Sequence, residues 1–227
     1  MGRKFLASES TWVYNGRNAG WKMLPLPSIS SRGKHMPKEF ELKYRADDAA
    51  IEAIRERYSD FQEFAMQTTY YGTADGALSR RRWTLRQRME NDISICTLKT
   101  PAGAYARNEF QVVAADILTA IPMLCSLGAP EELKELTKNG VTPICGAKFT
   151  RLAATITVDG SLLELALDRG YLTGGGKVLP IWEVEVELKE GSEETAVAFG
   201  EKLAEHFRLK AESRSKFARA RALAALP

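Results

Sequence analysis

The stretch Glu39-Phe-Glu-Leu-Lys43 alternates charged and apolar side chains, and Glu183-Val-Glu-Val-Glu187 repeats the pattern near the other end of the chain. Alternation with a period of two is typical of a β-strand, because successive side chains of a strand point to opposite faces. Each stretch therefore predicts a strand with one ionic face and one apolar face.

Similar stretches recur along the chain and are separated by turn residues such as Asp75-Gly76 and Asp159-Gly160. We predict eight strands, at residues 38–45, 64–72, 82–90, 92–100, 106–114, 147–158, 161–169 and 180–190. Many antiparallel strands in one chain of this size favour closure into a barrel, because closure removes exposed edges. We expect an α+β fold built on a closed eight-stranded antiparallel β-barrel.

Helical patterns lie between and after these strands. Asp47 or Asp48 caps a first helix, residues 116–139 contain short helical pieces, Ser192 opens another helix, and Ser213 or Ser215 opens a helix that runs to about Ala224. We expect the helices to cover the apolar outer face of the barrel, where Phe40, Leu42, Val184 and Val186 would pack. The C-terminal helix is expected near one opening.

Composition excludes several classes of protein. The 227 residues are 44% hydrophobic and 27% charged, and no run approaches the roughly 18 apolar residues of a spanning helix, so we expect no membrane partner. The net charge of +3 arises from residues 1–35, which carry +5, whereas residues 36–227 carry −2. A basic excess outside the patterned region does not support specific nucleic-acid binding.

Residues 1–35 lack the apolar core of a secretory signal and contain glycines and prolines that break periodicity. We expect them to form a tail that is disordered or outside the fold, followed by a single domain at residues 36–227. Met36 begins the first stretch with a strong pattern of alternating charged and apolar residues, so it is a candidate start of the natural chain.

Cysteine and histidine are scarce. Cys96, Cys125 and Cys145 are odd in number and lack metal-ligand spacing, which favours a reducing cytoplasm over a disulfide scaffold. Because the chain has only His35 and His206, we expect neither a histidine metal cage nor a Ser-His-Asp triad. Any chemistry must use carboxylates, lysine and arginine.

Charge recurs at every second residue on several predicted strands, and one interpretation is that each row is only a solvated face. The rows, however, separate by sign, whereas surfaces that serve solubility intersperse the signs. The acidic rows contain Glu39, Glu41, Glu164, Asp168, Glu183, Glu185 and Glu187, and the basic positions are Lys43, Arg86, Arg88 and Lys99. Facing glutamates indicate a divalent cation, and inward-facing arginines and lysines indicate an anion.

A polyanion bound through a divalent metal satisfies both conditions. Carboxylates such as Glu41 and Glu185 suit Mg²⁺ or Mn²⁺, which prefer hard oxygen ligands. The guanidinium groups of Arg86 and Arg88 match phosphate oxygens in a bidentate fork. The rows therefore predict a barrel with an ionic lumen.

The same residues resemble the CYTH domain of the triphosphate tunnel metalloenzymes. Glu39-Phe-Glu-Leu-Lys43 has the ExExK form that opens this domain, and the similarity covers roughly residues 38–224. Further matches keep the family's order: Leu85-Arg86-Gln-Arg88, Thr97-Leu-Lys99, Arg107-Asn-Glu109, Arg151, Glu164 to Asp168, Glu183-Val-Glu185-Val-Glu187, and Ser215-Lys216 with Arg219. The chain is most similar to the inorganic triphosphatase branch.

The resemblance implies an eight-stranded tunnel that binds a triphosphate and one or two Mg²⁺ or Mn²⁺ ions. The implied metal ligands are Glu39, Glu41, Asp168, Glu183 and Glu185. The implied substrate-binding residues are Lys43, Arg86, Arg88, Lys99, Arg107, Arg151 and Lys216. Glu41, Glu185, Lys99 and Lys216 are implied as catalytic residues, and Glu109 would orient a basic neighbour.

We therefore expect a metal-dependent hydrolase that acts on a small triphosphate, with inorganic triphosphate giving pyrophosphate and phosphate, in a monomer or homodimer. Class IV adenylyl cyclase activity, thiamine triphosphatase activity and a non-catalytic polyphosphate- or nucleotide-binding module remain alternatives. Gly174-Gly175-Gly176-Lys177 has the composition of a phosphate loop. No Ser or Thr follows Lys177 and a strand comes next, so we predict a hairpin there.

Overall fold

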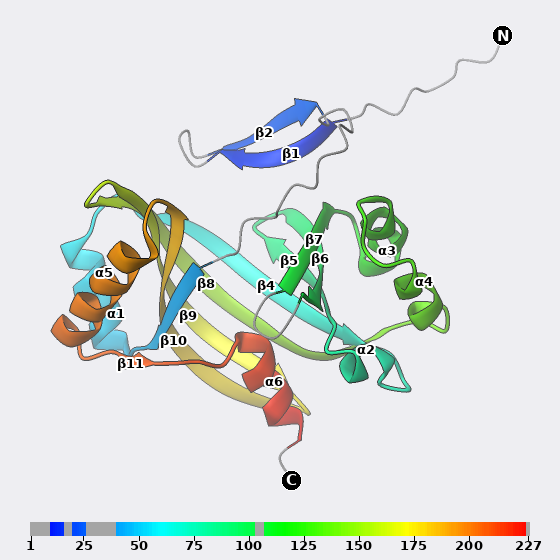
Figure 1. Cartoon of the computed structure of the whole chain (residues 1–227). Coiled ribbons are helices and arrows are strands. Elements are labelled where there is room, and N and C mark those ends of the chain that lie inside the picture. Colours follow the sequence, from blue (N-terminus) through cyan, green and yellow to red (C-terminus); the bar gives the residue numbers. More distant parts are fainter. Residues whose placement is uncertain (1–9, 16–19, 26–39, 103–106, 226–227) are drawn as a thin grey trace. The chain divides into compact units, whose positions relative to one another are not determined.

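The computed structural model describes residues 10–15, 20–25, 40–102 and 107–225 (Figure 1). The chain divides into two compact units, residues 1–36 and 37–227. The first unit contains an antiparallel hairpin of β1 (Ser10–Asn15) and β2 (Gly20–Pro25), which is not among the predicted strands. In the described parts of the chain, no helix is long and apolar enough to cross a membrane. The division into a tail and a single domain stays a prediction.

The second unit contains one antiparallel sheet of nine strands, in the order β11-β3-β10-β9-β8-β4-β5-β6-β7. The strands are β3 (Phe40–Arg45), β4 (Gln62–Gly72), β5 (Thr84–Glu90), β6 (Ile93–Pro101), β7 (Arg107–Val113), β8 (Thr142–Val158), β9 (Ser161–Gly174), β10 (Lys177–Glu190) and β11 (Lys210–Ala211). Eight of them correspond to the eight predicted strands, and β11 is additional. The expected α+β class and the large antiparallel sheet are confirmed.

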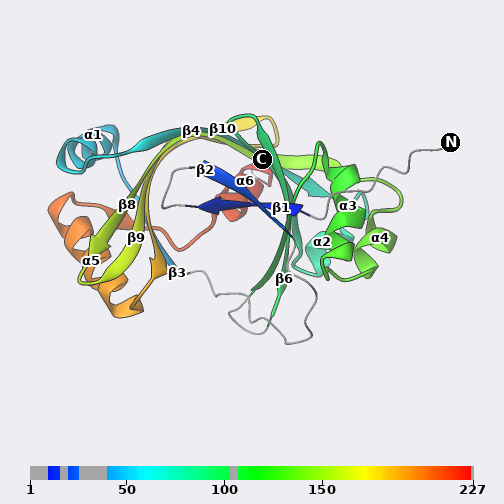
Figure 2. The same ribbon diagram turned by 90° about the horizontal axis from the view of Figure 1, so that it is seen from above.

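The expected closure of this sheet into a barrel is not seen among the described residues. The sheet bends into an arch (Figure 2), but the described residues of its two ends, β7 and β11, do not pair with each other. The outer edge of β3 is used by β11 instead, with Lys210 opposite Arg45 and Ala211 opposite Tyr44. The Glu212 amide then donates to the Lys43 carbonyl at 2.9 Å.

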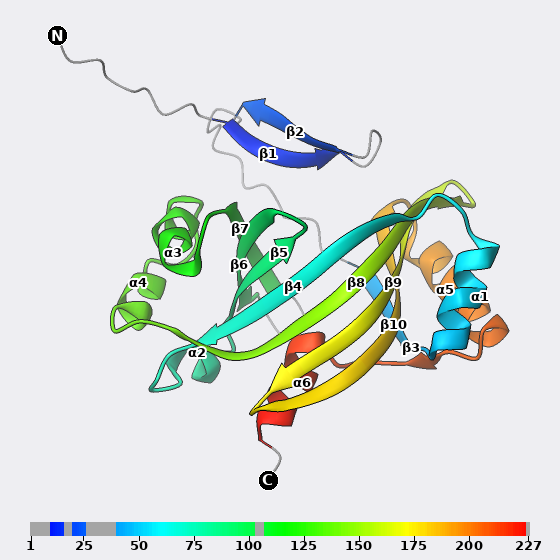
Figure 3. The same cartoon turned by 180° about the vertical axis from the view of Figure 1, so that it is seen from behind.

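Helices cover the outer face of the arch near both of its ends (Figure 3). The described residues form six helices, of which the last lies on the other face: α1 (Asp48–Arg57), α2 (Ala77–Arg80), α3 (Ile117–Ser126), α4 (Glu132–Thr137), α5 (Glu193–His206) and α6 (Lys216–Ala224). Asp47 caps α1 and Ser192 caps α5, because each side chain accepts a hydrogen bond from a backbone amide of the first turn.

The apolar residues of the alternating strands pack under these helices. Val184 and Val186 of β10 are fully buried, in a cluster that includes Ile54 of α1 and Leu203 of α5. A second cluster joins β5 and β6 to α3 and α4. Burial of an aliphatic side chain of this size contributes about 1.5–3 kcal/mol. The apolar faces of β3, β9 and β10, and those of β5 and β6, are thus held outward, and their charged residues are left on the concave side.

Helix α6 lies inside the arch (Figure 2), where Phe217 and Leu223 pack near Phe149 and Tyr70. Its far end meets the β9–β10 hairpin, and a side chain at Gly174 would collide with the backbone oxygen of Ala220. The hairpin turns through Gly175 and Gly176, whose φ angles are +57° and +74°. Positive φ at both central residues is typical of a tight two-residue hairpin. The hairpin predicted at this glycine run is therefore confirmed.

Candidate functional site

The cross-strand register places most of the predicted site residues on one face of the sheet. Lys43 of β3 lies opposite Glu185 of β10, and Glu183 of β10 lies opposite Asp168 of β9. Asp168 in turn lies opposite Arg151 of β8. Residues directly opposite each other in an antiparallel pair project from the same face. This is the concave face that carries α6.

Three carboxylates at the centre of this face form a cluster, which we call the carboxylate triad: Asp168, Glu183 and Glu185. Asp168 and Glu183 are fully buried and Glu185 is 6% exposed. One oxygen from each lies within 4.8 Å of the others. Several hard oxygen ligands at this spacing fit a divalent cation such as Mg²⁺ or Mn²⁺.

Three cationic side chains surround the triad. The Lys216 ammonium donates to Asp168 Oδ2 and Glu183 Oε2 at 2.8 Å each and to Glu185 Oε1 at 2.7 Å. Arg151 binds Asp168 through two parallel hydrogen bonds of 2.7 Å and also contacts Glu185. Arg219 of α6 donates to Glu183. Buried charges need such partners, because desolvation otherwise costs more than the fold can supply.

These partners keep Glu185 and Lys216 ionised. Burial alone raises the pKa of Glu185, but the charges of Lys216, Arg151 and Lys43 more than offset it and hold the pKa below its ordinary value. Burial opposes the charge of Lys216, yet Asp168 and Glu185 raise the pKa of its ammonium above the usual value. Both members of this pair are therefore charged at neutral pH.

A second acidic row runs beside the triad, with Glu41 opposite Glu187 and Glu187 opposite Glu164. Glu41 is the most open of the three, with a 33% exposed side chain and Lys43 at 2.7 Å. The register shifts between Leu188 and Glu190. Lys189 continues the alternation of Glu183, Glu185 and Glu187, and its ammonium lies 2.8 Å from Glu187 and 3.4 Å from Glu164.

The other half of the concave face carries an arginine and lysine array on β5 and β6. Arg86 and Lys99 lie 3.6 Å and 2.6 Å from Glu109 of β7, and Arg88 contacts Glu90. Within the described chain, the Nε atoms of Arg86 and Arg88 are buried and have no hydrogen-bond partner. Buried donors are normally satisfied, so orphaned ones indicate a ligand with acceptor oxygens.

Arg88 is electrostatically strained. Burial and then the charge of Arg86 lower the pKa of its guanidinium to about 10, and Arg151 adds to the repulsion. Glu90 only partly offsets these effects. The array therefore has an excess of positive charge that an anion would relieve, and the influence of Arg151 connects the array to the triad.

Two predicted site residues are not placed in these clusters. Glu39 lies outside the described residues. Arg107 shares the face of Glu109 but is exposed at the start of the edge strand β7. The roles assigned to all predicted site residues stay predictions.

Three neighbours of the clusters were not predicted as site residues. Glu90 continues the alternation of Arg86 and Arg88, and Arg219 lies one helical turn after Lys216, so both had a signal in the sequence. Lys189 continues the alternation of Glu183, Glu185 and Glu187, so it had a signal as well.

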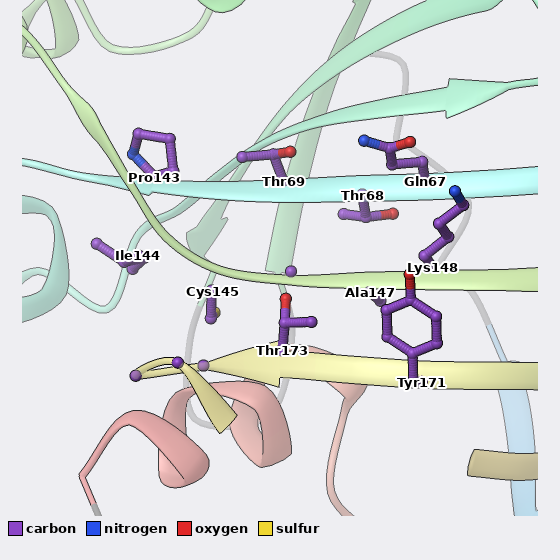
Figure 4. Close-up of a pocket in the computed structure, with 14 residues that line it drawn as sticks. Gln67, Thr68, Thr69, Pro143, Ile144, Cys145, Ala147, Lys148, Tyr171 and Thr173 are labelled. Atoms are coloured by element: carbon purple, nitrogen blue, oxygen red, sulfur yellow. The ribbon is translucent and has the colours of Figure 1, made fainter. Parts of the chain in front are cut away.

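A pocket of about 400 Å³ lies on the opposite face, over β4, β8, β9 and the turn at residues 174–176 (Figure 4). Gln67, Lys148 and Thr173 line it, and they alternate with residues of the concave face. The pocket contains no member of the triad or of the arginine array. It is therefore separate from the candidate site.

Known proteins include a matching family and relatives that the chain matches in part. A family model described as the CYTH domain matches residues 37–220. The inorganic triphosphatase of Haemophilus influenzae (strain ATCC 51907 / DSM 11121 / KW20 / Rd) is 28% identical over 148 residues, which are 63% of this chain and 42% of the relative. The matched region thus spans less than half the length of that enzyme.

Solved structures share the fold. HpAC1 from Hippeastrum, described with a dominant triphosphatase activity, has a TM-score of 0.56 and 20% identity, over 84% of this chain and 98% of that one. A candidate adenylate cyclase from Bacillus halodurans has a TM-score of 0.53 and 19% identity, over 80% and 96%. At these identities, the similarity shows the fold alone.

Proposed function

Because the chain belongs to the CYTH domain family, we propose that it hydrolyses a triphosphate and that inorganic triphosphate is its substrate, giving pyrophosphate and phosphate. The observation that carries the proposal is that one concave face holds a buried carboxylate triad and, beside it, Arg86 and Arg88 with orphaned Nε atoms. The similarity to an inorganic triphosphatase supports the choice of substrate.

The triad fits a divalent cation by its donor chemistry and spacing. Asp168, Glu183 and Glu185 would hold Mg²⁺ or Mn²⁺, with Glu41 and Glu39 from the neighbouring strand. When bound, the metal would neutralise charge on the phosphates and lower the pKa of a water molecule.

The protein's own part in the reaction is to bind and orient the phosphates. Arg86 and Arg88 would donate their free Nε–H groups to phosphate oxygens, Glu109 would hold the Lys99 ammonium in place, and Arg151 would add charge from β8. At an effective dielectric constant near 20, each cation 4 Å from a phosphate charge contributes about 4 kcal/mol before desolvation. Phosphoryl transfer depends mainly on such positioning and electrostatic stabilisation.

The attacking water needs a carboxylate to orient it and accept its proton. Glu185 is a weak base because its pKa is held low by Lys216, Arg151 and Lys43, which overcome the effect of burial. Glu41 contacts only Lys43 among the described ion pairs and is open to solvent. We assign this role to Glu41.

Phosphate release tests the proposal, with inorganic triphosphate, ATP, thiamine triphosphate and long-chain polyphosphate each assayed with Mg²⁺ and with Mn²⁺. We expect metal-dependent release, fastest from inorganic triphosphate. Cyclic AMP formed from ATP would indicate a cyclase instead, and binding of triphosphate without turnover would indicate a binding module.

Arg88→Ala should raise KM and lower kcat, while Arg81→Ala, on the outer surface beside Glu132, should change neither. A normal KM for Arg88→Ala would remove Arg88 from the substrate site.

The cellular setting follows from the cysteines. Cys96, Cys125 and Cys145 are buried and free. Free thiols fit a reducing compartment, so we place the protein in the cytoplasm. We also propose that residues 36–227 form a single domain.

A further inference from the structure

Lys216 occupies the point on which the three triad carboxylates converge. Its Nζ lies 2.7–2.8 Å from one oxygen of each carboxylate, and no other cation among the described residues contacts all three. The ring of Phe149, 5.1 Å away, lies on another side of the same ammonium. The triad therefore already holds a cation, supplied by the first residue of α6.

The charges of this cluster balance. Three carboxylates face Lys216, Arg151 and Arg219, and all six side chains are buried or nearly so. A divalent cation added to a neutral buried cluster would leave two uncompensated positive charges, and burying them is costly. Metal binding at the triad thus requires one of the three basic side chains, Lys216, Arg151 or Arg219, to move away from the carboxylates.

Lys216 is the side chain best able to leave. Arg151 lies within β8 and is fixed by two parallel hydrogen bonds to Asp168, and Arg219 is 5% exposed. Lys216 carries a point charge on a flexible stem and is 11% exposed. It also lies at the N-terminus of α6, where the helix dipole disfavours a positive charge.

We infer that Lys216 is a built-in cation that stabilises the metal-free triad and that a divalent metal must displace. The inference rests on the proposed metal site, and it adds that the resting protein and the metal-loaded protein use the same carboxylate oxygens for different cations. Lys216 therefore lowers the affinity of the triad for metal.

Direct binding of Mn²⁺, measured by calorimetry without any phosphate compound, tests this competition. Lys216→Met removes the charge at similar length, and we expect it to bind Mn²⁺ at least about tenfold more tightly than the wild type. Lys43→Met should give a smaller gain, because Lys43 reaches the triad only at Glu185, at 3.7 Å. Lys202→Met, on the exposed side of α5, should match the wild type. Equal or weaker binding by Lys216→Met would overturn the inference.

A second measurement uses the wild type and does not depend on how the variants fold. A buried, ion-paired lysine exchanges its ammonium protons slowly, so Lys216 should give a sharp ¹H–¹⁵N side-chain signal in the metal-free protein. We expect saturating Mg²⁺ to abolish that signal, and its persistence would contradict displacement. If no divalent metal binds to either protein, the proposed metal site itself fails. If both proteins bind it equally, only the competition fails.

Discussion

Replacement of Arg88 by methionine should stabilise the protein in the absence of phosphate compounds. Arg88 lies in the concave face with a buried, unpartnered Nε, and burial and Arg86 lower its pKa from its ordinary value to about 10. The folded state therefore disfavours the charged side chain by roughly 3 kcal/mol. Because the unfolded chain holds the proton more tightly, this cost is fully present at every pH below about 10, including neutral pH.

Methionine has similar length and no charge, so Arg88→Met removes this cost and loses the contact with Glu90. We expect a net stabilisation of about 1–2 kcal/mol, since a partly exposed ion pair contributes about 1 kcal/mol or less. Urea unfolding in buffer free of phosphate and metal measures the difference. Arg81→Met, at the surface ion pair with Glu132, is the matched control and should lose at most about 1 kcal/mol.

The same pair of proteins should respond differently to triphosphate. Ligand binding should raise the unfolding midpoint of the wild type and leave that of Arg88→Met nearly unchanged, because the orphaned donor is then absent. A loss of more than about 1 kcal/mol in Arg88→Met would show that Arg88 is satisfied in the resting protein, and the assignment of the array to an anion would lose its main support.

Three further predictions concern stability and access. Because the pKa of Glu185 is lowered in the folded state, this carboxylate contributes stability that is present above about pH 4.3 and is lost as the pH falls further. The difference in unfolding free energy between wild type and Glu185→Gln should therefore shrink from pH 7 to pH 3. A constant difference would contradict an ionised Glu185. Gly174→Ala should cost about 1–3 kcal/mol in urea unfolding, because the new methyl group collides with the Ala220 carbonyl, whereas Gly176→Ala, which has open space around it, should bear only the strain of its positive φ and cost less; the reverse order would exclude tight packing of α6 on the hairpin. Burial raises the pKa of Cys96 and Cys145 to about 11, so a thiol reagent should label no cysteine in the folded protein and all three after denaturation, and rapid labelling of any one would contradict its burial.

The strands and the face that each residue occupies could be predicted from the sequence because alternation is a local property. Val184 and Glu185 are neighbours with opposite preferences, and a strand is the only regular element that separates them to opposite faces. The grouping of Asp168, Glu183 and Glu185 followed from the same parity and from the family resemblance. All three project from the concave face, as predicted.

Features that depend on pairing between distant parts of the chain could not be predicted from the sequence. The short strand β11 has no pattern of its own, yet it pairs with Tyr44 and Arg45 at the edge of β3. The β-bulge between Leu188 and Glu190 has no glycine or proline that would mark it in the sequence. The contacts of Lys216 with three carboxylates required the position of α6 on the concave face, which no periodicity specifies.

The neutralisation of the triad by α6 has a consequence for how the chain matures. Ribosomes synthesise Asp168, Glu183 and Glu185 after Lys43 and Arg151 but before Lys216 and Arg219, so the nascent sheet contains acids that lack part of their basic partners. The middle of β9 and β10 should therefore stay hydrated and loosely paired until α6 docks. The order of synthesis, in addition to the stability of the finished fold, then sets when water is excluded from the concave side of the arch.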